Sequence, residues 1–397
     1  ANYNYFGVFE MLNLKNSAML VVAALCGYLA LMTPDWKTDL VAADNTCSYT
    51  SDYDCNSVDD ILVRNVTTAQ NELWLLDNAG TVGGTSTLTT NTLTFDVAAV
   101  LDADGDGDQD ILWYDSVVGQ LIFWIMEGGV KNNNSFLGNT VATLDGTGDF
   151  DGDGDTDILL KTALGDVKIW SIQNAGKASV ANIGTPAGTY AVIDTGDFNG
   201  DGIDDIVMQN AAGAVRIWQL DNTANLDVTI DVASIDTAYE LKKVGDLDND
   251  GDDDFIFRDD VTGQTLTWEM ENGARVVQNV IPGKNFHMEL ATVTDFDKDG
   301  DEDMMFRDVD TSSNNASDGD TIIWLMENNI KGSNSFLGNN SADFKLTAAA
   351  DFDGDSDNDI LYRNDVTGQS IIWNMQGGAK AGNYNLGSVS TDWEHRF

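Results

Sequence analysis

Four kinds of residue are scarce in this sequence. Among 397 residues there are 3 prolines, 3 cysteines, 2 histidines and 20 lysines and arginines, against 66 acidic residues. Because binding to phosphate backbones needs clustered Lys and Arg, this balance argues against a nucleic-acid partner. His287 and His395 fall in no catalytic constellation, and no nucleophile motif, phosphate loop or zinc pattern stands out. We therefore expect no enzyme. The alternative is a hydrolase whose acid pair lies among the many carboxylates, with a raised pKa in a cleft.

The three cysteines bear on the cellular location. Cys47 and Cys55 lie close together at the start of the repeats, where a local disulfide is expected. Cys26 lies in an apolar run and is typical of a small buried hydrophobic residue. One disulfide in an acidic chain rich in Asn, Thr and Gly favours an extracellular or cell-surface location.

What the sequence has in abundance is a repeat. Seven times an acidic loop is followed by a short apolar run and a tryptophan, at intervals of 47 to 56 residues. A period near 50 is typical of repeat architectures such as propellers. The loops, numbered 1 to 7 in chain order, begin at Asp52, Asp102, Asp149, Asp197, Asp246, Asp295 and Asp351. The tryptophans that follow them are Trp74, Trp124, Trp170, Trp218, Trp268, Trp324 and Trp373.

Residues 51–397 show no domain break. Short alternating apolar runs, such as 110–114 and 120–126, are bounded by Gly, Asn and Asp and are typical of strands. Each repeat has room for four strands, which make one propeller blade, so the predicted fold is mainly β, a seven-bladed β-propeller. Residues 392–397 resemble the strand that leads into other loops, and we expect them to complete the first blade and close the ring. The tryptophans hold one place in the repeat, which predicts a packing layer between blades.

Loop 2 shows a metal-binding pattern most clearly. Gly107 stands at position 6 of the loop, and positions 1, 3, 5 and 9 are Asp102, Asp104, Asp106 and Asp110. A tight loop turns such alternate side chains inward, and position 7 can add its backbone carbonyl. Oxygen ligation with many carboxylates is what Ca²⁺ prefers, whereas Mg²⁺ would retain more water. Position 12 is the apolar Trp113 and not the bidentate Glu of an EF-hand, so the loop joins two strands.

The other six loops carry oxygen ligands at the same four positions. In loops 3 and 4 these are Asp149, Asp151, Asp153, Asp157 and Asp197, Asn199, Asp201, Asp205. In loops 5 and 6 they are Asp246, Asp248, Asp250, Asp254 and Asp295, Asp297, Asp299, Asp303. In loops 7 and 1 they are Asp351, Asp353, Asp355, Asp359 and Asp52, Asp54, Asn56, Asp60.

These loops predict five to seven bound calcium ions. The site of loop 7 is expected to be weaker than the others because Ser356 replaces the glycine at position 6. The site of loop 1 is expected to be weakest, because Ser57 replaces that glycine and Cys55 stands between ligands. Seven ions would reduce the net charge from −46 to −32 and relieve self-repulsion in the compact state.

The loops also give the chain a family resemblance. The Asp-Phe-Asp-Gly-Asp-Gly pattern at 149–154, the following Asp-Ile-Leu and a later Gly-x-x-x-x-Trp are similar to FG-GAP/VCBS repeats. Such repeats form the propellers of integrin alpha subunits and occur in many bacterial surface proteins. The resemblance covers residues 50–397 and implies a seven-bladed propeller with calcium in its hairpin loops. Because the family includes adhesion, carbohydrate-binding and structural proteins, it says little about the partner.

Residues 1–33 differ from everything that follows. Residues 17–32 carry no charge, and with the apolar residues before them they predict one long hydrophobic helix that ends near Pro34, followed by a linker over 34–50. Three interpretations stay open: a helix that packs with copies of itself, a membrane anchor through residues 17–32, and a secretory signal segment. Phe6 and Glu10 have the spacing found in type IV pilins, which the segment resembles, but five residues later, and charged and polar residues at 13–16 interrupt the apolar run.

Together these features predict an extracellular structural protein. We expect a pilus-like subunit of a surface filament that carries a calcium-binding propeller head and forms a homo-oligomer through residues 1–33. The alternative is a membrane-anchored adhesin or carbohydrate-binding module that uses one propeller face for a glycan or protein ligand.

Overall fold

Strands occupy the alternating apolar runs throughout the part of the chain that the structure describes, residues 51–281, 287–309 and 319–396. This computed structural model contains no helix in those ranges, and hence none there that is long and apolar enough to cross a membrane. The helix expected over 1–33 and the linker expected over 34–50 lie outside the described residues. Cys55 is disulfide-bonded, while Cys47, its expected partner, also lies outside them.

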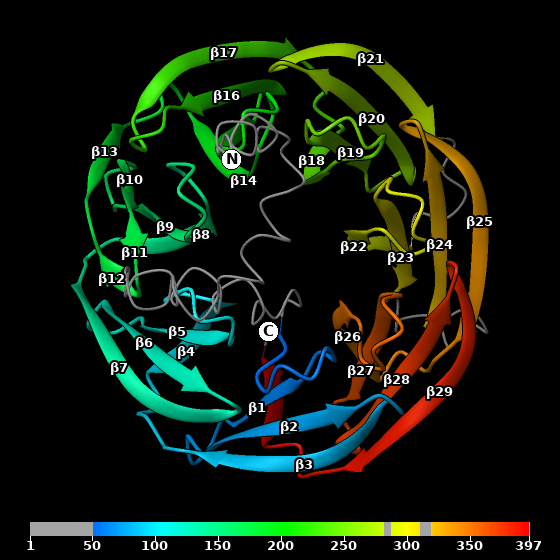
Figure 1. Ribbon diagram of the computed structural model, residues 1–397. Coiled ribbons are helices and arrows are strands. Elements are labelled where there is room, and N and C mark those ends of the chain that lie inside the picture. Colours follow the sequence, from blue (N-terminus) through cyan, green and yellow to red (C-terminus); the bar gives the residue numbers. More distant parts are fainter. Residues whose placement is uncertain (1–50, 282–286, 310–318, 397) are drawn as a thin grey trace, which may run out of the picture. The chain divides into compact units, whose positions relative to one another are not determined.

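Seven four-stranded antiparallel sheets follow one another around a ring (Figure 1), so the expected seven-bladed β-propeller is confirmed. Blades 2 and 3 consist of β4 (Phe95–Leu101), β5 (Asp110–Asp115), β6 (Gln120–Glu127), β7 (Val130–Asn139) and β8 (Thr143–Gly148), β9 (Asp157–Lys161), β10 (Val167–Trp170), β13 (Ala181–Gly184). Blade 3 adds a small hairpin of β11 (Ile172–Gln173) and β12 (Gly176–Lys177). Blades 4 and 5 consist of β14 (Tyr190–Gly196), β15 (Asp205–Asn210), β16 (Ala214–Leu220), β17 (Leu226–Ser234) and β18 (Glu240–Gly245), β19 (Asp254–Asp259), β20 (Gln264–Glu271), β21 (Ala274–Ile281).

The remaining three blades have the same order of strands. Blades 6 and 7 consist of β22 (Met288–Thr294), β23 (Asp303–Asp308), β24 (Asp320–Glu327), β25 (Ile330–Asn339) and β26 (Phe344–Ala350), β27 (Asp359–Asn364), β28 (Gln369–Gln376), β29 (Ala379–Ser388). Blade 1 draws on both ends of the propeller, with β30 (Trp393–Arg396) as its innermost strand, followed by β1 (Ile61–Asn65), β2 (Asn71–Asp77) and β3 (Thr81–Leu88).

The place of a strand in its blade explains its sequence. Second strands such as β19, β23 and β27 are buried at every residue, because neighbouring blades cover both of their faces. Their residues therefore form continuous apolar runs that start and end on polar groups. The outermost strand β29 instead alternates between exposed and half-buried residues, as a half-solvated strand does.

Each hydrophobic cluster joins two neighbouring blades. One packs Trp373 and Met375 of blade 7 against Phe296 of loop 6. Another packs Trp74 of blade 1 against Phe352 and Leu361 of the seventh repeat. The seven repeat tryptophans are only 0–9 % exposed, so the predicted packing layer between blades is confirmed.

The C-terminal strand closes the ring as expected. β30 pairs with β1 in antiparallel register, with Leu62 opposite Arg396 and Asn65 opposite Trp393. The His395 side chain fixes this join, because its ring nitrogens lie 3.2 Å from Thr347 Oγ1 and 2.9 Å from Ser370 Oγ, both in blade 7. Burial lowers the pKa of His395 to about 3, so the join contains a neutral imidazole at ordinary pH.

At the end of the propeller opposite the acidic loops, four buried arginines each connect their own blade to the next one. They hold the same place in the second strands of blades 1, 5, 6 and 7 and are Arg64, Arg258, Arg307 and Arg363. Arg307 donates to the carbonyls of Gly319 (3.1 Å), Asn340 (3.0 Å) and Phe344 (2.8 Å). The guanidinium therefore satisfies carbonyls of the segment that leads into blade 7, a role that sequence reading missed.

Five further basic residues cover the repeat tryptophans. Four lie at the start of an outer strand and Lys177 lies in β12, and each has its charged group 3.5 to 4.5 Å from the indole centroid beneath it. The pairs are Lys131 over Trp124, Lys177 over Trp170, Arg275 over Trp268, Lys331 over Trp324 and Lys380 over Trp373. Nine of the chain's 20 lysines and arginines are thus used in packing.

Replacing Arg307 should destabilise the propeller strongly. Arg307→Leu removes the donors to several buried carbonyls, and we expect a loss of about 3 kcal/mol or more in the free energy of unfolding. Arg307→Lys keeps the charge but not the planar guanidinium with its several donors, and should recover only part of the lost free energy of unfolding. Denaturant unfolding in calcium measures both. Equal stability of wild type and Arg307→Leu would contradict a structural role for this side chain.

Candidate metal centre

In blades 2 to 7 the acidic loop joins the first and second strands, and in blade 1 loop 1 leads into the second strand, β1. All seven loops therefore lie at the same end of the propeller. The carboxylate at position 1 organises each loop by accepting backbone N–H groups. Asp102 accepts from Gly105 (2.8 Å) and Gly107 (3.0 Å), and Asp149 accepts from Gly152 (2.8 Å) and Gly154 (2.9 Å). Positions 4 and 6 need left-handed backbone, at +75° for Gly105 and +98° for Gly107, which glycine adopts without strain.

Position 9 is the most buried ligand position. The carboxylate of Asp110 has no exposed surface and accepts N–H groups from Met126 of the third strand (2.7 Å) and from Ala103 of its own loop (3.3 Å). Burial, with added repulsion from Asp104 and Asp106, raises the pKa of Asp110 to about 8. The equivalent pKa is raised to about 7 in Asp303, to about 9 in Asp254 and to about 8 in Asp60, Asp157, Asp205 and Asp359.

Position 3 leaves a buried oxygen without a hydrogen-bond partner. This is true of Oδ1 in six of the seven loops, in Asp54, Asp104, Asp151, Asp248, Asp297 and Asp353. In loop 4 the residue is Asn199, whose Nδ2 lies 3.3 Å from Asp205 Oδ2. An unpartnered buried carboxylate oxygen is costly, so its recurrence at one position indicates that the loops are shaped for a cation.

The predicted ligands do converge. Carboxylate oxygens of positions 1, 3 and 5 in loops 2, 5 and 6, and of positions 1, 3 and 9 in loop 3, lie within 4.8 Å of one another. Loop 1, for which the weakest site is predicted, gathers Asp52, Asp54 and Asp60 in the same way. The residues present therefore fit a hard cation with oxygen ligands, whose charge would offset the repulsion among them.

Position 7 has a role that the sequence did not reveal. Besides its backbone carbonyl, it brings a side-chain carboxylate that accepts an N–H group from the turn between the third and fourth strands of its own blade. The donor is Gly128 for Asp108 (2.6 Å), Asn272 for Asp252 (2.6 Å) and Asn328 for Asp301 (2.7 Å). The recurrence of Asp at this position was a visible signal, but its partner lies about 20 residues or more away.

In loops 1, 4, 5 and 6 the backbone N–H of position 8 ties the loop to the one before it around the ring. The N–H of Asp204 in loop 4 donates to the carbonyl of Asp149 in loop 3 (2.8 Å), and the N–H of Asp149 donates back to Asp204 Oδ2 (2.8 Å). The same reciprocal pair joins Asp253 to Asp197, with distances of 2.7 and 3.0 Å. The residue that supplies the position 1 ligand is thus held by the following repeat.

The turn between the third and fourth strands of the next blade also holds loops 1, 2, 4, 5 and 6. The N–H of Gly378 donates to the carbonyl of Phe296, at position 2 of loop 6 (2.7 Å), and that of Asn329 donates to Leu247 in loop 5 (2.9 Å). Gly378 has φ of +70°, and a Cβ there would lie 2.7 Å from Leu325 Cδ2. Each candidate site is therefore built by two neighbouring repeats.

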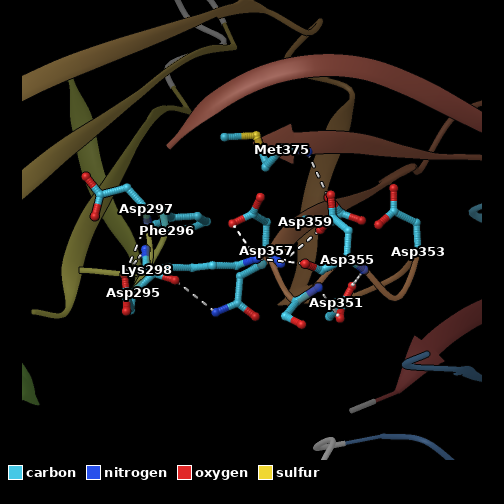
Figure 2. A network of polar contacts seen from close by, with 12 residues as sticks. Asp295, Phe296, Asp297, Lys298, Asp351, Asp353, Asp355, Asp357, Asp359 and Met375 are labelled. Carbon is cyan, nitrogen blue, oxygen red and sulfur yellow. Dashed lines mark hydrogen bonds and ion pairs between the residues drawn. The ribbon is translucent and has the colours of Figure 1, made fainter. Parts of the chain in front are cut away.

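Figure 2 shows loops 6 and 7 side by side, with a lysine between them. Lys298, at position 4 of loop 6, donates from Nζ to the carbonyl of Asp355 (2.7 Å) and lies 3.1 Å from Asp357 Oδ1. In loops 2, 3, 4 and 7 position 4 is glycine. Lys298 therefore gives this pair of loops an ionic contact that a glycine at position 4 does not provide.

Comparisons with known proteins agree with this architecture. Residues 149–208 match a family model described as FG-GAP-like repeat. With the seven blades, this match confirms the expected FG-GAP-like β-propeller. A search of curated proteins found no match.

The matches among solved structures have low identity. The Dos1 propeller is 12 % identical with a TM-score of 0.45, over 87 % of this chain and 89 % of that one. BBS1N in complex with ARL6DN is 10 % identical with a TM-score of 0.42, over 75 % and 82 %. The dihydro-heme d1 dehydrogenase NirN in complex with DHE is 9 % identical with a TM-score of 0.45, over 82 % and 66 %.

The raised pKa values predict how stability depends on pH. An unfolded Asp titrates near pH 3.9 and the folded position 9 carboxyls near 8, so the folded state holds more protons between these values. Without calcium, stability should therefore fall as the pH rises from about 4 to about 8. With calcium, the cation replaces the proton, so its stabilising effect should grow over the same window.

Thermal unfolding at pH 5.5 and pH 8, each in calcium and in chelator, measures this effect. We expect the shift in Tm caused by calcium to exceed roughly 5 °C at pH 8 and to be clearly smaller at pH 5.5. Asp110→Asn mimics the protonated acid and should reduce the pH dependence in chelator. A Tm that is identical in calcium and in chelator at pH 8 would refute the metal assignment.

A single ligand change should affect a single site. Asp104→Asn removes one ligand charge from loop 2 and should weaken one ion by roughly tenfold or more, with little effect on distant loops. Native mass spectrometry at limiting calcium counts the ions that stay bound. The matched control is Asp227→Asn, which makes the same charge change at an exposed residue of β17. Loss of an ion in both variants would point to net charge as the cause.

Proposed function

We propose that this chain is an extracellular propeller whose acidic loops bind five to seven calcium ions. The observation that carries this proposal is the unpartnered, buried Oδ1 atom at position 3 of six loops. Calcium would be coordinated by these atoms and by the converging carboxylates, since it takes 6–8 oxygen ligands. We propose calcium at loop 1 as well, because its three aspartates converge like those of the other loops.

The role we propose is structural and not catalytic. The FG-GAP-like match and the seven blades fit an extracellular structural or adhesion-type role. Nine of the 20 lysines and arginines lie against carbonyls or indoles, and with 66 acidic residues the exterior stays strongly acidic, which disfavours self-association of the propellers except through a dedicated element.

We further propose that residues 1–33 are that element. Their apolar run, as the sequence has it, suits a helix that packs with copies of itself, so that the propellers decorate the outside of a surface filament. The second candidate is an adhesin that contacts a membrane through residues 17–32 and binds a glycan or protein ligand on one face of the ring.

Electron microscopy of the full-length chain in calcium tests the assembly. We expect regular fibres, and Val21→Asp, which places a charge in the apolar run, should abolish them. The matched control is Val141→Asp on the propeller, where the side chain is 98 % exposed and fibres should persist. Dispersed ring-shaped particles, or particles seated on added membrane, would contradict the filament and favour the adhesin.

A further inference from the structure

Blade 1 is the one place where the ring is joined without a continuous chain through the blade. Its innermost strand, β30, has four residues, and its other three strands begin more than 300 residues earlier. A short terminal strand held by one neighbour is expected to open more readily than internal strands, because few hydrogen bonds must break. Further contacts between blade 1 and blade 7 therefore determine the stability of the closed ring.

Loop 7 supplies such a contact. The N–H of Asp351, at position 1 of loop 7, donates to Asp59 Oδ2 (2.9 Å), and the N–H of Asp59 donates to the carbonyl of Asp351 (2.8 Å). A Cβ at Gly354 would lie 3.3 Å from the carbonyl oxygen of Ser57 and 3.1 Å from Val58 Cγ2. Loop 7 thus rests directly on loop 1, across the join.

Loop 7 also contains two buried carboxylate oxygens without partners. Asp353 is 8 % exposed and Asp359 is fully buried, and each has one carboxylate oxygen that no described group contacts by a hydrogen bond. Their other oxygens are held, Asp353 Oδ2 by the hydroxyl of Tyr384 (2.8 Å) and Asp359 Oδ1 by the N–H of Met375 (2.8 Å). These hydrogen bonds keep the two side chains from rotating, so the fold fixes the direction in which the two oxygens without partners point.

One of these orienting groups also touches blade 1. The ring of Tyr384 packs so closely on Gly80, in the turn of blade 1 between β2 and β3, that a Cβ there would lie 2.2 Å from Tyr384 Cδ2. The groups that shape the cation site of loop 7 are accordingly held in place by blade 1 on two sides, through Asp59 and through Gly80.

We propose that cation binding at loop 7 and closure of the ring are thermodynamically coupled, with Asp59 as a positioning residue that acts across the join. Asp59 lies at position 8 of loop 1 and is not a ligand of loop 7, yet it fixes the backbone of the residue that supplies the position 1 ligand. The proposal rests on the calcium binding proposed above. Although Ser356 marks loop 7 as weaker from its sequence, its place at the join gives this ion the largest effect on closure.

The expected effect of the loop 7 ion on ring opening follows from mass action. An ion that binds loop 7 only when blade 1 is in place stabilises the closed ring by the factor 1 + [Ca²⁺]/Kd, which is about 100-fold at a concentration 100 times Kd. Removing that ion should raise the opening of β30 by the same factor, whereas removing an ion from a distant loop should leave it unchanged.

Hydrogen exchange of the peptide that contains β30, measured by mass spectrometry on the full-length chain, reports this opening. In calcium we expect Asp353→Asn to accelerate exchange of residues 393–396 by roughly tenfold to 100-fold. Asp151→Asn makes the same change at position 3 of loop 3 and should not accelerate it. Asp59→Ala should match Asp353→Asn, and the double variant should be no faster than either.

Each outcome decides the matter. Equal exchange in Asp353→Asn and Asp151→Asn, or additive effects of Asp59→Ala and Asp353→Asn, would overturn the coupling while leaving calcium binding intact. If Asp59→Ala does not fold, Asp59→Asn keeps one acceptor for the N–H of Asp351 and should exchange more slowly than Asp353→Asn. Exchange and Tm that do not change when wild type is moved from calcium to chelator would instead refute calcium binding, and the coupling with it.

Discussion

The desolvation of carboxylates is the constraint on which the rest of this structure depends. In each loop the position 9 aspartate is buried at the start of a second strand, and in loop 2 its partners are backbone N–H groups of its own loop and of the third strand. These hydrogen bonds do not offset the cost of removing the carboxylate from water, since the pKa of Asp110 is still raised to about 8. The loop geometry, the spacing of ligands and the demand for a cation all follow from placing these charges inside the fold.

The same constraint explains how the few basic residues are used. Four arginines lie in the second strands and bind carbonyls that lead to the next blade, and five lysines or arginines lie over tryptophans. Few of the carboxylates are paired with these cations, because the cations are needed where carbonyls and indoles must be covered. The calcium ions that we propose would neutralise the loops of this acidic propeller.

Neighbouring repeats are joined by hydrogen bonds between their loops as well as by packing between their blades. Position 8 of one loop holds position 1 of the preceding loop, and the turn at Gly378 holds position 2 of loop 6. Since every loop is completed by the following repeat, no blade can form its site alone. The closed ring gives each loop such a neighbour, and the pairing of β30 with β1 extends this to the last loop through Asp59.

Sequence alone determined the seven blades, the packing role of the tryptophans and the places of the acidic loops, because each repeats with a period that local spacing reveals. It also determined the closing strand, because residues 392–397 resemble the strand that leads into other loops. It did not reveal what Asp108 at position 7, Asp204 at position 8 or Arg307 contacts, although all three recur in register. Their partners lie about 20 to 55 residues away in turns and loops of this or the neighbouring blade, and for Asp59 the partner is 292 residues away. Only the tertiary structure decided these contacts, because spacing along a chain fixes which way a side chain points but not which distant backbone group is there to meet it.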